Sequence, residues 1–283
     1  MELGQVLGAL PPIVDPNVLH GAAARDDAAV YRIAPDRALV ATVDFFTPIV
    51  DDPSEFGAIA AANALSDVYA VGARPLFALG ITAFPRDKLG TGLLEKIVSG
   101  GAAKLGEAGV PVVGGHSVDD AEPKFGYAVI VATAIKRGLC PPELEREAIA
   151  VMTTLNREAS AAMLAAHATA ATDVTGYGLI GHLANLKGGA DVELRAVPFM
   201  RGVRDLAGRD LFPDGSRRNH AAYRDQVTWD GVAEIDQMML CDAQTSGGLL
   251  VAIPSYNADR FEQAARSAVR IGVMRGDGKI RVA

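Results

Sequence analysis

The segment from residue 51 to residue 72, DDPSEFGAIAAANALSDVYAVG, constrains the fold more than any other part of the chain. Pro53 and Ser54 suit the start of a helix and Gly72 suits its end, so we expect a single helix here. Its apolar residues nearly encircle it, which is typical of a helix buried on all sides. Such a helix needs other elements around it, and the 49% hydrophobic content of the 283-residue chain can supply them.

Strands and helices are mixed along the rest of the sequence without a strict βαβ repeat. The patterns predict strands over 28–33, 37–46, 75–84, 110–115, 124–134, 191–196, 248–254 and 269–274, and helices over 92–109, 141–168 and 257–268. Residues 173–186 form a glycine-punctuated entry into an apolar helix, and residues 208–230 read as irregular. This order indicates an α+β or mixed α/β chain. The strand-rich pattern gives way to a long helical stretch after Ala134, which predicts two domains, 1–134 and 135–283.

Composition excludes several classes of protein. The net charge of −7 argues against a general nucleic-acid binder. The longest apolar run, 126–135, is too short to span a bilayer, and the N-terminal MELGQVLGALPPIVDP lacks the basic start of a signal peptide. Cys140 and Cys241 lack zinc-site spacing and suit buried thiols in a reducing compartment. We therefore expect a soluble, cytoplasmic protein with no nucleic-acid or membrane partner.

Four aspartates stand at the ends of expected elements or on a buried face: Asp27, Asp44, Asp67 and Asp173. The Asp26-Asp27 pair is either a solvated turn before a strand or a site in which one carboxylate faces inward. Asn63 shares a helix face with Asp67, and the pair could simply make a structural hydrogen bond to a neighbouring loop. Asp173 could cap a helix or bind a metal.

Two glycine-containing segments accompany these carboxylates. VVGGHS (112–117) predicts a strand that ends in a turn, where backbone N–H groups could meet a phosphate, although such a turn can also be purely structural. His116 within it could equally be a structural histidine. CDAQTSGGLL (241–250) predicts a loop that admits a close approach, or merely a tight turn before a buried strand.

Aspartates without a Cys/His set indicate Mg²⁺ rather than zinc. Magnesium held by aspartates commonly carries nucleotide phosphates, yet the sequence has no G-x-x-x-x-G-K-[ST] motif. The residues therefore predict Mg-nucleotide binding by a route other than a P-loop.

Five blocks in order give the chain a more specific likeness: ARDDAAVY, TVDFFTPIVDDPSEFGAIAAANALSDVYAVGARP, GGHSVDDAEPKFGYAV, ATDVTGYGLIGHL and CDAQTSGGLL. Together they resemble the selenophosphate synthetase (selenide, water dikinase) family of the aminoimidazole ribonucleotide synthetase-like superfamily. The resemblance runs from about residue 13 to beyond residue 250.

The resemblance implies a two-domain fold whose N-terminal domains form a homodimer with a β-barrel core. It implies ATP, selenide and water as substrates, and selenophosphate, AMP and phosphate as products. The residues implied to hold Mg²⁺ are Asp27, Asp67 and Asp173. The residues implied to contact ATP are Ala24, Arg25, Asp26, Asp44, Asn63, Asp67, Gly115, His116 and Ser117.

The chain departs from the family pattern in two places. The family has an early segment with a Cys or selenocysteine followed by a Lys, whereas this sequence has no Cys before Cys140 and no Lys before Lys88. We therefore assign no catalytic residue and expect those of the family to precede Met1. The family also has a further strand and loop where YAVIVATAIKRG runs on directly. Omission of residues would account for both departures, and a selenocysteine codon read as a stop would account for the first.

Three expectations follow. Asp27, Asp67 and Asp173 should converge on one cleft, and a chain break should lie between Val129 and Ala134. The 283-residue polypeptide should bind Mg-ATP without making selenophosphate. Two other functions remain open: a catalytically inactive Mg-ATP-binding paralogue that acts as a partner or regulator, and a phosphotransferase acting on a different small acceptor.

Overall fold

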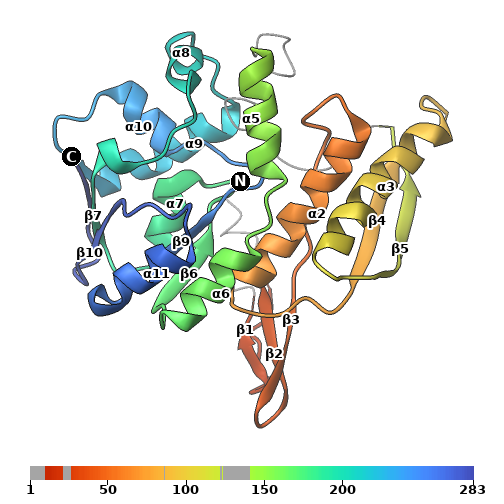
Figure 1. Cartoon of the computed structure of the whole chain (residues 1–283), viewed down its shortest axis with the longest axis horizontal. Coiled ribbons are helices and arrows are strands. Elements are labelled where there is room, and N and C mark those ends of the chain that lie inside the picture. The colour runs from red at the N-terminus through yellow and green to blue at the C-terminus, as the bar shows by residue number, and fades with distance from the viewer. Residues whose placement is uncertain (1–9, 22–26, 86, 122, 124–140) are drawn as a thin grey trace.

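A computed structural model describes residues 10–21, 27–85, 87–121, 123 and 141–283, and all structural statements concern these residues. The expected break between Val129 and Ala134 and the expected strand 124–134 lie outside them. Figure 1 shows helix α2 (Pro53–Ala70) near the middle of the molecule. The later part of the chain lies on one side of α2, and the N-terminal strands and helix α3 (Thr91–Glu107) lie on the other sides.

The first half of the chain contains two small sheets beside two helices. Strands β1 (Val18–His20), β2 (Ala29–Ala34) and β3 (Arg37–Ala41) form an antiparallel sheet in that order. Strands β4 (Ala78–Phe84) and β5 (Val112–Asp119) pair in parallel. The Asp52 carboxylate starts α2 by accepting the N–H groups of Ser54 and Glu55, which would otherwise lack partners.

The second half has two further sheets surrounded by helices. Strands β7 (Ala190–Val192), β8 (Val227–Trp229), β10 (Gly272–Met274) and β11 (Ile280–Val282) form a sheet in the order β10-β7-β11-β8. Strands β6 (Ala170–Asp173) and β9 (Leu249–Ala252) form an antiparallel pair. The helices are α5 (Pro142–Met152), α6 (Arg157–Ala165), α7 (Gly178–Asn185), α8 (Val203–Gly208), α9 (Asp214–Tyr223), α10 (Glu234–Leu240) and α11 (Ala258–Ala264).

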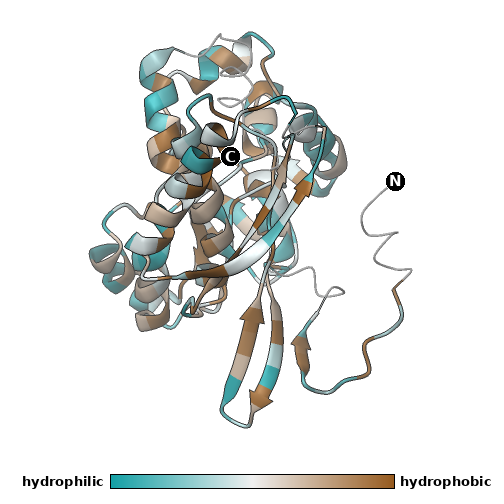
Figure 2. Ribbon diagram, turned by 90° about the vertical axis from the view of Figure 1, so that its right-hand side faces the viewer, coloured by the Kyte–Doolittle hydropathy of each residue, from teal (hydrophilic) through white to brown (hydrophobic). Residues whose placement is uncertain are grey.

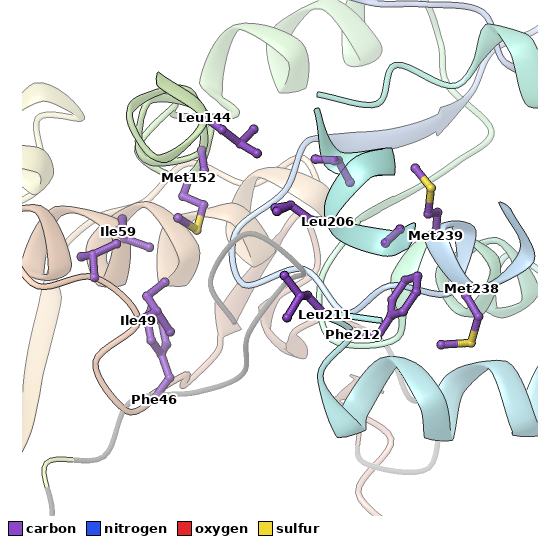
Figure 3. Packing of buried hydrophobic residues seen from close by; sticks show 14 of the residues in the cluster. Phe46, Ile49, Ile59, Leu144, Met152, Leu206, Leu211, Phe212, Met238 and Met239 are labelled. Atoms are coloured by element: carbon purple, nitrogen blue, oxygen red, sulfur yellow. The ribbon is translucent and has the colours of Figure 1, made fainter. Parts of the chain in front are cut away.

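The largest hydrophobic core joins the two halves of the chain. Phe46, Phe56 and Ile59 from the first half pack in one cluster with residues from α5, α8 and α10. Figure 3 shows Ile59 and Ile49 facing Met152, with Leu206 and Leu211 continuing the cluster toward Met238 and Met239. Burial of α2 against both halves confirms the expectation from its sequence, and it fixes the polar residues of α2 relative to the second half.

Two glycines permit α2 and α3 to pack with their backbones in direct contact. A Cβ atom on Gly57 would lie 1.9 Å from the Ile97 carbonyl oxygen, and one on Gly100 would lie 2.0 Å from the Ser54 carbonyl oxygen. Neither obstruction is a flexible side chain that could move aside. Gly100 is therefore a packing residue within α3.

Several sequence predictions were wrong in detail. The helix expected over 141–168 is two helices, α5 and α6, separated at residues 153–156. The irregular region 208–230 contains helix α9 and strand β8, and β1 and β11 were not anticipated. The turn expected after residues 110–115 is absent, because β5 continues through Gly114, Gly115 and His116 to Asp119.

The predicted β-barrel is not present as a closed sheet in the described part of the chain, whose four sheets are all open. Strands β2 and β3 instead project from the body of the molecule as a hairpin with apolar positions along it (Figure 2). None of the described helices has the length and apolar character needed to cross a membrane. The domain division at residue 134 stays a prediction.

Replacing Gly57 with alanine tests the contact between α2 and α3. We expect Gly57→Ala to lower the free energy of unfolding by roughly 1–3 kcal/mol, because the added methyl group must push the two backbones apart. Gly106→Ala is the matched control: a Cβ atom there meets no atom within 4 Å, so stability should stay unchanged or rise slightly. Chemical denaturation of both variants measures the difference, and equal stabilities would contradict the contact.

Candidate functional site

Asp67 and Asp173 are buried carboxylates from opposite halves of the chain. Asp67 lies on α2 and is 7% exposed, and Asp173 ends β6 and is 1% exposed. Both oxygens of Asp173 are buried without a hydrogen-bond partner. The Ser66 hydroxyl lies close enough to lower the pKa of Asp173 without completing a hydrogen bond of ordinary geometry. Since buried polar atoms are nearly always paired, Asp173 is a strong candidate to receive a ligand.

Asp27 joins this group through a hydrogen bond from the second half. The Thr172 hydroxyl donates to Asp27 Oδ1 at 2.9 Å, across the 145 positions that separate the two residues in sequence. Thr42, just beyond β3, donates to Asp67 Oδ2 at 2.5 Å and lies 3.4 Å from the Asp27 carbonyl oxygen. The half-buried Asp27 is therefore not a freely solvated turn residue, and the choice left open by its sequence is resolved.

Burial and neighbouring carboxylates raise the pKa values of the buried aspartates. Burial raises the pKa of Asp67 to about 9, and the nearby carboxylates of Asp44, Asp173 and Asp27 add to the rise. Burial also raises the pKa of Asp173 to about 6, with a further contribution from Asp44. The structure thus brings the predicted metal residues Asp27, Asp67 and Asp173 together, in an arrangement that disfavours three negative charges unless a cation is present.

Asp44 and Asn63 form the outer part of the cluster. Asn63 Nδ2 donates to Asp44 Oδ2 at 2.8 Å, which is the structural bond to a neighbouring loop that the sequence allowed. Desolvation by the surrounding protein raises the pKa of Asp44, and the hydrogen bond from Asn63 opposes the rise. Asp44 is exposed to solvent, unlike Asp67 and Asp173.

The segment that follows Asp173 is held by the glycine-containing loop 241–248. Gln244 donates its backbone N–H to the Thr175 carbonyl at 3.0 Å, and a Cβ atom on Gly247 would lie 2.1 Å from the Val174 carbonyl oxygen. Of the two interpretations that the sequence left open for this loop, the close approach applies, and it is made by the protein's own residues 174 and 175. Helix α7 begins at Gly178, with Tyr177 in the capping position, so Asp173 does not cap it.

Sequence reasoning missed Thr42, Thr172 and His182 as parts of the site. His182 lies on α7, and its Nδ1 is 3.2 Å from the Thr172 hydroxyl. Burial lowers the pKa of His182 to about 4, which favours the neutral ring. In the sequence, Thr172 directly precedes Asp173 and His182 follows ten positions later. This spacing does not indicate a site until the fold is known.

Other predicted site residues lie apart from the aspartates or outside the described residues. Ala24, Arg25 and Asp26 belong to the latter group. Gly115, His116 and Ser117 lie within β5, which Figure 1 shows at the right-hand edge of the molecule, away from β6. A Cβ atom on Gly115 would lie 2.0 Å from the Gly80 carbonyl oxygen, so this glycine serves strand packing. The predicted phosphate-binding turn is thus replaced by a strand.

The carboxylates of the cluster have the chemistry to bind a hard cation, but they are not yet placed closely enough to coordinate one together. Within the described ranges, no three His, Cys, Asp or Glu side chains are already grouped so that they could hold a metal ion. The donors that the aspartates offer are carboxylate oxygens, the ligands that Mg²⁺ prefers. The unpartnered oxygens of Asp173 and the raised pKa of Asp67 show what a cation would relieve.

Cys241 contributes no reactive thiol to this site. It is fully buried, it is not in a disulfide, and burial together with Asp242 raises its pKa to about 12. A thiol with such a pKa stays protonated and is a poor nucleophile. Cys241 is therefore a core residue, as its sequence context predicted, and Cys140 lies outside the described residues.

Comparison with known proteins identifies the fold and the family. Residues 25–135 match the AIR synthase related protein N-terminal domain, and residues 131–283 match the corresponding C-terminal domain. Among solved structures, tt0281 from Thermus thermophilus is similar with a TM-score of 0.67 and 20% identity, covering 91% of this chain and 88% of that one. AaThiL complexed with AMPPCP and TMP has a TM-score of 0.63 at 17% identity, covering 91% and 87%. These likenesses establish the fold.

Two curated relatives are much closer in sequence. Selenide, water dikinase of Carboxydothermus hydrogenoformans is 42% identical over 319 residues, covering 99% of this chain and 93% of the relative. That of Myxococcus xanthus is 44% identical over 304 residues, covering 94% and 86%. Both alignments are longer than the 283 residues of this chain, so the relatives contain positions that have no counterpart here. The motifs, the fold and these relatives agree, and the chain belongs to the selenide, water dikinase family.

Proposed function

We propose that this protein uses ATP to make selenophosphate from selenide and water, releasing AMP and phosphate. The observation that carries the proposal is the cluster of Asp27, Asp67 and Asp173, assembled from both halves of a chain whose relatives are selenide, water dikinases. An inactive paralogue or a kinase for another acceptor would share the cluster. The 42–44% identity to these relatives over nearly the whole chain favours selenide as the acceptor.

The aspartates Asp27, Asp67 and Asp173 would hold Mg²⁺, and Asp44 would face the nucleotide with Asn63 and Asp67. Bound Mg²⁺ neutralises the polyphosphate and so supports phosphoryl transfer. The protein's own contribution is to place the carboxylates: Thr172 fixes Asp27, Thr42 fixes Asp67 and Asn63 fixes Asp44. Ala24, Arg25 and Asp26 directly precede Asp27 and would extend the ATP contacts.

The selenium chemistry needs a nucleophile that the described residues do not supply. Cys241 is excluded by its burial and its raised pKa. We therefore keep the family's Cys or selenocysteine and Lys segment as the source of that chemistry, although this sequence has no Cys before Cys140. The free buried thiol of Cys241 is in keeping with a reducing, cytoplasmic setting.

A second copy of the chain would cover an exposed apolar face of the N-terminal strands. On the β2–β3 hairpin, Tyr31 and Leu39 are paired across the strands, and both are exposed with Ile33. On the β4–β5 pair, Leu79 and Ile81 are exposed beside Val112 and Val118. Apolar strands this open favour pairing with another sheet, which supports a homodimer. If Gly115, His116 and Ser117 contact ATP, a partner copy could bring them to the aspartates.

The proposed reaction is tested with the 283-residue polypeptide and with the same polypeptide preceded by a family-type segment that supplies Cys and Lys. Both should bind Mg-ATP, measured by calorimetry. With selenide present, the extended polypeptide should form AMP and selenophosphate, followed by phosphorus NMR, while the shorter one should at most hydrolyse ATP slowly. Binding without selenide-dependent products in either polypeptide would favour an inactive paralogue. Products that require a different acceptor would favour the other kinase.

The raised pKa of Asp67 predicts a pH-dependent stability. A folded-state pKa of about 9, above the ordinary value of 3.8, means that the folded protein keeps a proton that the unfolded chain releases. This stabilisation is complete below pH 4 and is lost as the pH rises toward 9, by at most about 1.4 kcal/mol per pH unit. The melting temperature of the metal-free protein should therefore fall between pH 6 and 8.5, and Mg²⁺ should raise it most at the upper end.

Asp67→Asn should flatten this pH dependence and remove the response to Mg²⁺, since the neutral amide neither titrates nor repels its neighbours. Asp225→Asn is the matched control, because the Asp225 side chain is 85% exposed and should behave like the unchanged protein. A metal-free protein whose melting temperature rises from pH 6 to 8.5 would contradict the electrostatic account of the cluster.

Placing a charge on the exposed strand face should separate the proposed dimer. Ile81→Asp introduces a carboxylate where a second copy would pack, so sedimentation velocity should show a shift from dimer to monomer. Tyr256→Asp is the control, because Tyr256 is 82% exposed but lies in the second half of the chain, away from these strands. An unchanged dimer in Ile81→Asp, or a monomer in the parent protein, would show that this face is not the dimer contact.

A further inference from the structure

A buried chain of hydrogen bonds connects His182 on α7 to the Asp27 carboxylate. The backbone N–H of Thr175 donates to His182 Nε2 at 3.0 Å, so Nε2 is an acceptor in this contact. The Thr175 hydroxyl lies 3.2 Å from the same nitrogen. A neutral imidazole that accepts at Nε2 carries its proton on Nδ1.

The Nδ1 proton then determines what Thr172 can do. His182 Nδ1 lies 3.2 Å from the Thr172 hydroxyl oxygen, so the ring donates to that oxygen. The hydroxyl hydrogen is left to donate elsewhere, and Asp27 Oδ1 lies at 2.9 Å while the Asp173 carbonyl oxygen lies at 3.1 Å. A carboxylate is the stronger acceptor of the two, which favours donation to Asp27.

We propose that His182 is a positioning residue that, through Thr172, fixes the Asp27 carboxylate for metal binding. The inference rests on the proposed function, because it takes Asp27 as a Mg²⁺ ligand. Three features support it: the hydrogen bonds run in series from the Thr175 N–H through His182 and Thr172 to Asp27, His182 and Thr172 are each 4% exposed, and Thr172 contacts both His182 and Asp27. The low pKa of His182, caused by burial, agrees with a ring that stays neutral.

A purely structural role would explain why His182 is buried. It would not explain why the hydrogen bonds all donate in one direction, from Thr175 through His182 and Thr172 to Asp27. A histidine that merely filled space could adopt either tautomer, whereas here the Thr175 N–H selects one of them. Groups that orient a metal ligand typically change metal affinity by roughly 10–100-fold when they are removed. The inference therefore makes a quantitative claim about metal binding that is separate from stability and from turnover.

The affinity for Mn²⁺, used as a paramagnetic probe in the presence of AMPPCP, tests this claim by electron paramagnetic resonance. Thr172→Val removes the hydroxyl at nearly constant volume and should weaken Mn²⁺ binding about ten-fold. His182→Asn places an amide N–H near the Nδ1 position and should retain most of the affinity. His182→Gln places its amide near Nε2, loses the contact with Thr172 and should weaken binding several-fold. Thermal unfolding confirms that each variant is folded.

Two matched controls separate positioning from general damage. Thr169→Val makes the same chemical change at an exposed threonine whose hydroxyl bonds the Ala252 carbonyl, and it should leave Mn²⁺ affinity unchanged. His220→Gln replaces another buried histidine of the second half, which bonds Gln237, and should also leave it unchanged. Loss of affinity in these controls equal to that in Thr172→Val would overturn the inference.

Asp27→Asn distinguishes failure of the inference from failure of the proposed function. If Asp27→Asn and the parent protein bind Mn²⁺ equally, or neither binds it, the metal assignment is wrong and the inference falls with it. If Asp27→Asn weakens binding but Thr172→Val does not, the inference alone is wrong. Nitrogen NMR of the parent protein gives a readout that needs no variant: His182 should be the neutral Nδ1–H form, and an Nε2–H form would overturn the chain of bonds.

Discussion

Mutual repulsion of the buried aspartates is the constraint around which this protein is organised. Asp67 and Asp173 approach each other from different halves of the chain, with Asp27 and Asp44 nearby. Without a cation, the cluster can exist only if protons or hydrogen-bond donors compensate the charge, and the raised pKa of Asp67 shows that a proton does part of this. Hydrogen bonds from Thr42, Thr172 and Asn63 hold Asp67, Asp27 and Asp44 in place, so the site without a cation is assembled at a cost in stability.

That cost is offset by apolar packing between the two halves of the chain. Helix α2 carries Asp67 on one face, places Phe56 and Ile59 in the core shared by both halves, and packs tightly on α3 through Gly57 and Gly100. Asn156 adds a polar tie between the halves, donating to the Ser66 hydroxyl and to the Gly247 carbonyl, both at 2.8 Å. Rigid packing of this kind allows like charges to be held together, because neighbouring elements cannot simply move apart.

The sequence predicted the central helix for a physical reason, whereas the expectation that Asp27, Asp67 and Asp173 lie together came from the family resemblance. An apolar helix that carries an Asn/Asp pair at positions i and i+4 can be accommodated in few environments, because its polar pair must be hydrogen-bonded. Asp27 and Asp173 stand beside strands with buried positions. It failed where long-range contacts decide the outcome. Gly114 and Gly115 resemble a turn locally, but pairing with β4 keeps them in a strand. Helix α9 lies in a polar segment and is ordered by contacts such as that of Ser216 with Asp242. The relay from His182 depends on residues ten positions apart meeting across a loop, which no local pattern encodes.

The division of the site between the two halves has a further consequence for how ligand binding affects the protein. Asp27 and Asp67 come from the first half and Asp173 from the second, while Thr172 reaches across to Asp27. A cation bound by all three carboxylates would remove their repulsion and add attraction along the same contact that Phe56, Ile59 and Met152 form by burial. A ligand bound where both halves meet would also stabilise their arrangement through its binding energy. Cation binding and the docking of the two halves would then be coupled thermodynamically, with Asp67 on α2 as the residue that takes part in both.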